Sequence, residues 1–195
     1  RSDGYRANNA LEQQSGSGDL RYTTPEFTAY LNLSGDNQHL QFPGPRTVDP
    51  SIGLNELVTN RTGTDTPFDF GNKQDANLAT GFTRTLWNGA ELIVDGGYRN
   101  KKTQADFLDG TDPFFFSFVD ATLQTWSLTP RLSIKNSILG LPSTILTGVD
   151  YYDYSYVQDH RNVAGGIPIH VYDLTQQTLG AYWQQTIGLL PTTDF

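Results

Sequence analysis

Three histidines are the side chains of this sequence best suited to metal binding or proton transfer. They are His39, His160 and His170, and no two of them are spaced as H-x-x-x-H or H-x-H. His160 and His170 fall in or near one expected loop, but two imidazoles would still need further ligands from elsewhere to hold zinc. We therefore expect solvated histidines and no metal site.

Two carboxylate-rich stretches raise the question of calcium. They read GTDTPFDFGNKQD, at 63–75, and DGTDPFFF, at 109–116. Neither spaces its oxygen ligands as an EF-hand loop does. Both stretches are expected to be acidic, solvated loops.

The groups that nucleophilic catalysis requires do not occur in a recognisable arrangement. The chain has no cysteine, which removes thiol nucleophiles and thiolate metal sites. It has no G-x-S-x-G elbow and no phosphate-binding glycine loop. We expect a protein that is not an enzyme and carries no cofactor. The net charge of −8 also argues against a nucleic-acid partner, because no basic stripe is available to meet phosphates.

Tyrosines are better candidates, for contact with a ligand. Tyr152 and Tyr154 belong to a tyrosine-rich run that approaches a long loop. Aromatic side chains offer contact area at low entropic cost, so these two are expected to help line a ligand vestibule. His160, in the loop beyond, is a third candidate contact. The other interpretation of the run is an interfacial girdle combined with loop packing.

A second aromatic group lies in the loop before that run. Phe114, Phe115 and Phe116 are consecutive in a segment that should otherwise be solvated. An apolar run of this kind predicts burial against a ligand, an internal plug or another loop. Packing between loops is as good an explanation as ligand contact.

The elements that must position these residues are β-strands. Residues 90–102, AELIVDGGYRNKK, alternate strictly, which puts Leu92 and Val94 on one face. The other face carries a carboxylate at Glu91 and again at Asp95. Similar alternation predicts strands at about 10–24, 27–35, 75–87, 125–135, 144–156 and 178–190.

The strand expected at 125–135, TWSLTPRLSIK, carries one apolar and one polar face. The apolar set includes Trp126, Leu128, Leu132 and Ile134. Pro130 falls within it, and because proline cannot donate to a strand ladder it predicts an edge strand or a bulge here.

The connections between these strands are sorted by length. Short turns are expected at 25–26, 88–90, 136–143 and 191–194, and long loops at 43–74, 100–120 and 158–170. If the strands run up and down, all turns lie at one end and all loops at the other, as in outer-membrane barrels. A soluble β-domain has no general reason to sort its loops in this way.

Composition agrees with an exported all-β protein. Apolar residues make up only 36% of the chain, and no run of about 18 apolar residues could form a membrane helix. The prediction is an all-β, antiparallel, up-and-down transmembrane β-barrel segment of about seven to eight strands.

Several stretches resemble the barrel domain of TonB-dependent outer-membrane receptors. They are SDGYRANNALEQQSGSGDLRY, LQFPGPRTVDPSIGLNEL, ELIVDGGYRNKK, TWSLTPRLSI, GVDYYDYSY and IPIHVYDLTQQTLGAYWQQTIGL. The individual motifs are loose, and their order and spacing carry the resemblance over essentially the whole chain.

The resemblance implies an active importer of ferric siderophores or similar scarce ligands in the outer membrane of a Gram-negative bacterium. It implies a barrel of about 22 strands, surrounded by outer-membrane lipid, plugged by an N-terminal domain and energised through TonB. This sequence shows no recognisable plug and no TonB box, so residues 1–195 are expected to be an internal fragment of the barrel domain. Phe195, straight after a turn, is interpreted as a truncation point.

Two other functions remain open at this stage. A passive porin or adhesin-type barrel would share the lipid-facing band and the loop sorting but would need neither plug nor TonB. A soluble, secreted β-sandwich binding domain would bury the alternating apolar face within this chain.

Overall fold

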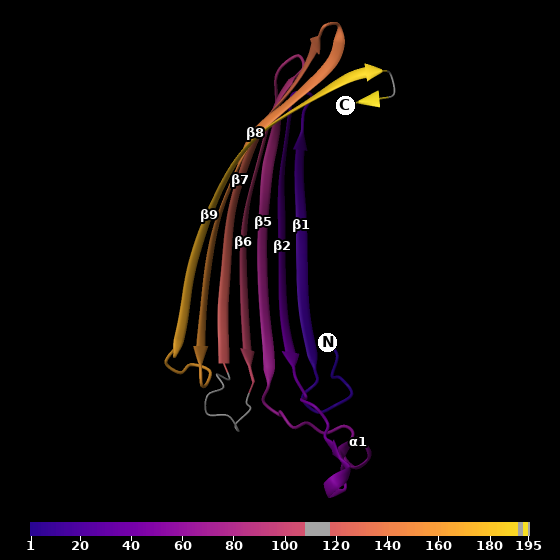
Figure 1. The fold of residues 1–195 in the computed structure, drawn as a ribbon, viewed down its shortest axis with the longest axis vertical. Helices are drawn as coiled ribbons and strands as arrows, with labels where there is room; N and C mark the ends of the chain where they lie inside the picture. The colour runs from indigo at the N-terminus through magenta and orange to yellow at the C-terminus, as the bar shows by residue number, and fades with distance from the viewer. Residues whose placement is uncertain (108–117, 191–192, 195) are drawn as a thin grey trace.

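The computed structural model describes residues 1–107, 118–190 and 193–194, and they form one long, curved antiparallel sheet (Figure 1). Its strands follow one another in the order β1-β2-β5-β6-β7-β8-β9-β10. Their bounds are β1 Leu11–Thr23, β2 Phe27–Gln41, β5 Phe70–Trp87, β6 Ala90–Asp106, β7 Phe118–Ile138, β8 Leu141–Arg161, β9 His170–Leu190 and β10 Thr193–Asp194. Each strand pairs with its sequence neighbour in the sheet, so the topology is up-and-down as predicted.

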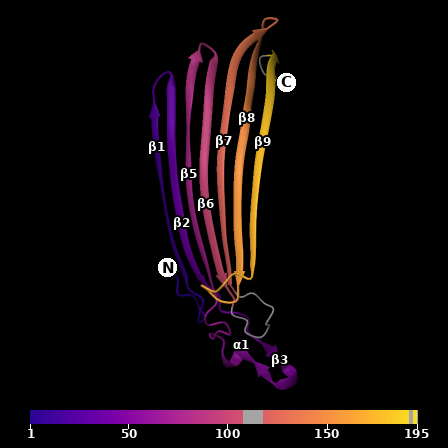
Figure 2. The same cartoon turned by 90° about the vertical axis from the view of Figure 1, so that its left-hand side faces the viewer.

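The sheet is a single layer without a hydrophobic core. Ala90 and Phe118 are the only buried apolar residues among those the structure describes. No second sheet packs on either face in Figure 2. The alternative of a β-sandwich, which needs two packed layers, is therefore wrong.

The two faces differ in chemistry as the alternation predicted. Leu92 lies opposite Leu132, and Tyr98 opposite Trp126, with ring centroids 4.3 Å apart. We call the face that carries Leu92 and Trp126 the apolar face, and the face that carries Asp95 the polar face. Side chains directly opposite in a ladder share a face, so the apolar set continues across the sheet.

The apolar face is apolar over only part of its height. Toward the loops, residues in register on this face are polar: Gln14, Asn37, Gln74, Lys102 and Thr122. Toward the turns, most residues on this face are apolar, and Leu20, Leu128 and Leu179 remain about half exposed or more. We call this turn-proximal part the apolar band.

The strands are longer than predicted, and the loops correspondingly shorter. β7, β8 and β9 have 21 residues each, whereas about 9–11 residues cross a membrane. The loops expected at 43–74 and 158–170 occupy 42–69 and 162–169. The sequence did not reveal this extension because the loop-proximal ends of the strands carry polar residues on both faces and lack the regular alternation that marks a strand.

The short connections lie at the opposite end of the sheet from the loops (Figure 1). The turn expected at 136–143 is only Leu139 and Gly140, whose φ values are 53° and 81°. Positive φ at both central residues is typical of a type I′ hairpin turn. The Asn88-Gly89 turn occurs as predicted, with Gly89 at φ 88°.

Pro130 lies in an interior strand, so the prediction of an edge or a bulge is wrong. β7 pairs with β6 through Pro130 itself, opposite Val94. Its pairing with β8 lapses between Leu128 and Arg131 and resumes in the same register. The sheet thus accommodates the missing N–H by omitting ladder pairs rather than by adding a residue.

The longest connection, 42–69, has structure of its own. It contains β3 Val48–Asp49, the 3-10 helix η1 Pro50–Ile52, β4 Leu54–Asn55 and the short helix α1 Glu56–Thr59. No helix in the described part of the chain is long and apolar enough to cross a membrane.

Candidate functional site

A stripe of aromatic and polar side chains runs along the polar face of β8 toward the loops. Its members are two residues apart, so they share this face; they are Tyr152, Tyr154, Tyr156, Gln158 and His160. The rings of Tyr152 and Tyr154 are stacked, with centroids 6.1 Å apart and an interplanar angle of 16°. We call these five residues the β8 stripe.

Hydrogen bonds continue the β8 stripe beyond the stacked pair. The Tyr156 hydroxyl lies 2.8 Å from Gln158 Oε1, to which it donates. Gln158 Nε2 lies 2.9 Å from His160 Nε2. The ring of Tyr172, from β9, meets His160 edge to face at 5.7 Å. The stripe is therefore fixed by its own contacts, with ring faces and polar atoms in sequence.

A hollow of about 290 Å³ lies beside the β8 stripe on the polar face. Tyr156 and Gln158 form one wall, and Lys101 lies on β6. The remaining lining side chains, on β6 and β7, are small or of medium size: Thr103, Ala105, Val119, Ala121 and Leu123. The arrangement offers an aromatic ring, an amide and a cation around one apolar floor, which suits a small anionic ligand with a flat apolar part.

The predicted contact residues have different outcomes. Tyr152 and Tyr154 lie side by side on the polar face, in the stripe. His160 joins them, but it is the second-to-last residue of strand β8, one before Arg161, rather than a loop residue, and it pairs in register with His170. Phe114, Phe115 and Phe116 lie outside the described residues. Their predicted contact with a ligand stays a prediction.

Sequence reasoning missed part of this site. The period of two that selects Tyr152 and Tyr154 also selects Tyr156, the last residue of the expected strand, and Gln158, two residues past its end. Lys101 could not be found in this way, because its position beside Tyr156 depends on the registers of two strand pairs.

A charged cluster occupies the polar face of β2, β5 and β6, level with the hollow beside the β8 stripe. Asp36 and Asp75 lie directly opposite each other, an unfavourable placement for like charges. Arg99 relieves it by donating to Asp75 through Nε, at 3.2 Å, and through Nη2. Lys73 Nζ lies 3.7 Å from Asp36 Oδ1. Within the part of the chain that the structure describes, no group of three potential ligands converges on a metal position.

A second polar network crosses the same face nearer the turns. Asp95 accepts hydrogen bonds from the Tyr30 hydroxyl and from Arg131 Nη2, each at 2.7 Å. Tyr30 belongs to β2 and Asp95 to β6, and both are opposite Gly81 of the intervening β5. The absence of a side chain at Gly81 leaves the space in which this bond forms.

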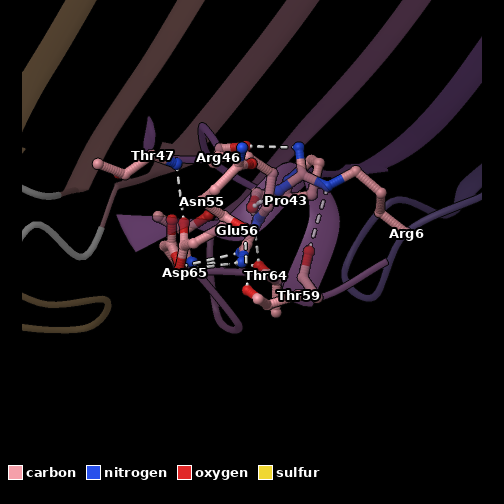
Figure 3. Close-up of polar contacts among 12 residues, drawn as sticks. Arg6, Pro43, Arg46, Thr47, Asn55, Glu56, Thr59, Thr64 and Asp65 are labelled. Carbon is pink, nitrogen blue, oxygen red and sulfur yellow. Dashed lines mark hydrogen bonds and ion pairs between the residues drawn. The ribbon is translucent and has the colours of Figure 1, made fainter. Parts of the chain in front are cut away.

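The loop 42–69 is held by side chains, as Figure 3 shows. Arg46, whose side chain is only 4% exposed, pairs with Asp65 at 2.9 Å and Glu56 at 3.4 Å. Glu56 Oε2 also accepts from the backbone N–H of Thr47, at 2.8 Å. These contacts bring the start, middle and end of the loop together.

Side chains of the segment before β1 bind the backbone of the same loop. Arg6 donates to carbonyl oxygens at 2.7–3.1 Å, those of Pro43, Gly44 and Gly63. Asn8 Nδ2 lies 2.5–2.9 Å from three more, those of Phe42, Thr66 and Asp69. Two side chains thus meet six carbonyl groups at the loop base, and four of these, those of Phe42, Pro43, Thr66 and Asp69, also accept hydrogen bonds from within the loop.

Two carboxyl groups at the loop end have shifted pKa values. The Ser51 hydroxyl and N–H both donate to Asp49 and lower the pKa of its carboxyl. Burial, reinforced by the nearby charge of Asp69, raises the pKa of the Asp106 carboxyl. Both residues lie beyond the apolar band.

Solved structures with the same fold are known, although no family model matches the sequence and no curated protein matches it. FpvAI, in its complex with pyocin S2, superimposes on 97% of this chain with a TM-score of 0.72 and 12% identity. The ferric citrate transporter FecA, in its unliganded form, covers 93% with a TM-score of 0.65 and 13% identity. The siderophore receptor PirA from Acinetobacter baumannii covers 97% with a TM-score of 0.63 and 13% identity.

This chain is short relative to those proteins. It spans 30%, 28% and 29% of their respective lengths. Because the sequence identity is low, the likeness concerns the fold alone. The segment matched is only part of each of those longer chains.

Proposed function

Since the chain has the fold of one stretch of the barrel wall of TonB-dependent outer-membrane receptors, we propose that it belongs to an active importer. The imported ligand is a ferric siderophore or a similarly scarce small anion, and TonB supplies the energy through a plug domain. Residues 1–195 are a partial barrel domain of this receptor. The observation that carries the proposal is the division of the sheet into an apolar band and taller polar strand ends.

Lipid of the outer membrane covers the apolar band in this proposal. Exposed leucines and tryptophans on one face of a single-layer sheet are favourable only against lipid or protein. The loop-proximal halves of the strands stand above the lipid in water, because the apolar face becomes polar there, at Gln14, Asn37, Gln74, Lys102 and Thr122. The loops are then extracellular and the turns periplasmic.

The ligand enters from the loop side and meets the β8 stripe. Tyr154 and Tyr156 supply flat apolar contacts, and Lys101 supplies a positive charge for an anionic group. Gln158 and His160 donate or accept hydrogen bonds that orient the ligand. Phe114, Phe115 and Phe116 are proposed as further ligand contacts.

The test uses the complete receptor in its native host. Tyr156→Ala and Lys101→Ala should each reduce uptake of ⁵⁵Fe-labelled siderophores or ferric citrate about tenfold or more, since each removes roughly 1.4 kcal/mol or more of binding. Tyr151→Ala is the matched control, because Tyr151 lies on the same strand but opposite Leu128 on the apolar face. Its barrel insertion and uptake should both be retained.

Two results would contradict the proposal. Uptake that persists in a strain without TonB would favour the passive porin. Equal loss of uptake in Tyr151→Ala and Tyr156→Ala, with all barrels inserted, would show that the polar face is not the binding face.

A further inference from the structure

A shallow groove of about 650 Å³ lies on the apolar face across β7, β8 and β9. Most of its lining residues belong to that face: Leu92, Pro130, Leu132, Thr147, Val149, Ala181 and Trp183. The other three, Arg131, Gly148 and Tyr182, lie in the polar-face row between them. The groove is closer to the turns than to the loops.

The groove has a structural cause. Pro130 has no N–H, and the pairing of β7 with β8 lapses at this point. On the polar face, Tyr182 lies across Gly148, where a Cβ atom would come 2.7 Å from the tyrosine hydroxyl. Ala181, opposite Val149, is small, so the apolar face of β9 carries no large side chain between Leu179 and Trp183.

We propose that this groove binds one acyl chain of a phospholipid from the periplasmic leaflet. The proposal rests on the proposed function, which places the apolar band in the outer membrane. The groove is continuous with that band, and an unfilled hollow in lipid would forfeit dispersion contacts along its whole lining. Arg131, the only charged residue of the lining, is paired with Asp95 and does not call for a polar ligand.

The position of the groove within the apolar band indicates which membrane leaflet supplies the lipid. Leu92 lies two residues inside the turn-proximal end of β6, and the turns are on the periplasmic side in the proposed orientation. An acyl chain that lies against Leu92 and Trp183 therefore belongs to the inner leaflet, which holds phospholipid. Trp183 is 64% exposed and can cover one side of that chain.

Ala181→Phe tests the site by filling it. Complete receptors are extracted from outer membranes in a mild detergent and weighed by native mass spectrometry. The wild-type receptor should retain one phospholipid that Ala181→Phe loses. Leu179→Phe is the matched control, because it adds the same ring to the same face of β9 outside the groove, and it should retain the lipid. Equal phospholipid counts in all three receptors would overturn the proposal.

Fluorescence separates failure of the groove from failure of the membrane assignment. The receptor is placed in liposomes whose phospholipid is brominated on the acyl chains, and Trp183 emission is obtained as the difference between wild type and Trp183→Phe. This emission should be quenched by the bromine atoms. Filling the groove with Ala181→Phe should reduce the quenching. Trp126, on the same face, reports ordinary lipid contact. Quenching of Trp126 with no effect of Ala181→Phe overturns the groove alone. No quenching of either tryptophan overturns the proposed function with it. A dimer that Ala181→Phe dissociates would identify a second copy as the occupant and overturn the lipid.

Discussion

Gly81 shows how the absence of one side chain leaves room for a hydrogen bond across the polar face of the sheet. Tyr30 and Asp95 come from strands on either side of it and meet over its Cα. A Cβ atom at this position would lie 2.7 Å from Tyr30 Cε1, 2.7 Å from the Val94 carbonyl oxygen, and closer still to Asp95 Oδ1. The carbonyl is part of the ladder and cannot move aside.

Gly81→Ala should therefore destabilise the barrel by about 1–3 kcal/mol, the usual cost of overpacking. The measurement is the urea midpoint of the complete receptor in detergent. Gly96→Ala is the matched control, since its nearest contacts would be at 3.5 and 3.9 Å. If both variants unfold at the same urea concentration, the Tyr30–Asp95 contact does not depend on this space.

Leu139 adopts a backbone conformation that is unfavourable for leucine. Its φ of 53° belongs to the left-handed region, which costs most side chains roughly 1–2 kcal/mol and asparagine less. Its side chain is 98% exposed, so no packing compensates. Leu139→Asn should thus stabilise the hairpin by up to about 1 kcal/mol, raising the urea midpoint. Leu139→Ala keeps the backbone cost and should give no such gain; a gain equal to that of asparagine would point to solvation instead.

Asp106 should make stability depend on pH in an unusual direction. Because burial raises its folded pKa, the folded state favours the protonated carboxyl. The resulting stability is present below the unfolded pKa, about 4, and is lost as pH rises through the folded pKa. Asp106→Asn should then raise the urea midpoint at pH 7 and leave it unchanged near pH 3.

The pH comparison has an internal control at the same end of the sheet. Asp49 has a lowered pKa, so its charge stabilises the loop above pH 4 and protonation removes that contribution. Asp49→Asn should not raise the midpoint at either pH. A wild-type midpoint that rises steadily between pH 4 and pH 7, with no gain in Asp106→Asn, would contradict the role assigned to Asp106.

Among the elements, β7 provides the most direct test of which face meets lipid. Leu128 is 49% exposed on the apolar face, whereas the neighbouring Ser127 lies opposite Gly97 on the polar face. Leu128→Arg should cost roughly 2–4 kcal/mol if this position is near the membrane midplane. Ser127→Arg should cost much less, because the side chain can extend into a wet lumen. Similar losses in urea unfolding for the two variants would reject the assignment of faces.

The strands were predictable where one face is apolar and the other polar. Residues 90–102 are an example, and their pairing across Leu92 and Leu132 follows from the same alternation. The ends were not predictable, since 36–41 and 157–161 are mostly polar, without alternation, and resemble loops in sequence. Only the partner strand, which keeps the ladder in register there, makes them strands. Pro130 was misjudged for a related reason: the local rule favours an edge, but pairing on the β6 side holds it inside.

On the scale of the whole molecule, the described residues form an open, curved sheet and not a closed barrel. Within the residues that the structure describes, β1 forms a ladder with β2 alone, and no other layer covers the apolar band. Expressed alone, residues 1–195 should aggregate or require detergent, because unpaired strand edges and exposed leucines both favour association. Light scattering and analytical ultracentrifugation would test this. A soluble monomer with one sharp thermal transition would be inconsistent with the barrel segment.

The candidate site was predictable only in part. Tyr152 and Tyr154 could be selected because alternation within one strand decides which way they face. The hollow beside Tyr156 could not, since it depends on how far β6 and β7 are displaced along each other. Neither could the charged cluster, in which Asp75 and Arg99 are far apart in sequence and meet only through the register of β5 with β6.

The carbonyl contacts of Arg6 and Asn8 bear on how the proposed receptor could be re-engineered. A loop that satisfies its own backbone can be cut out and grafted onto another barrel. This one is completed by Arg6 and Asn8 from the segment before β1, so residues 42–69 moved alone would arrive with the carbonyl groups of Gly44 and Gly63 lacking the Arg6 donor. The transferable cassette is instead the pair of connections with the β1–β2 hairpin between them, residues 1–69. Libraries that diversify the loop for new ligands should accordingly hold Arg6 and Asn8 constant.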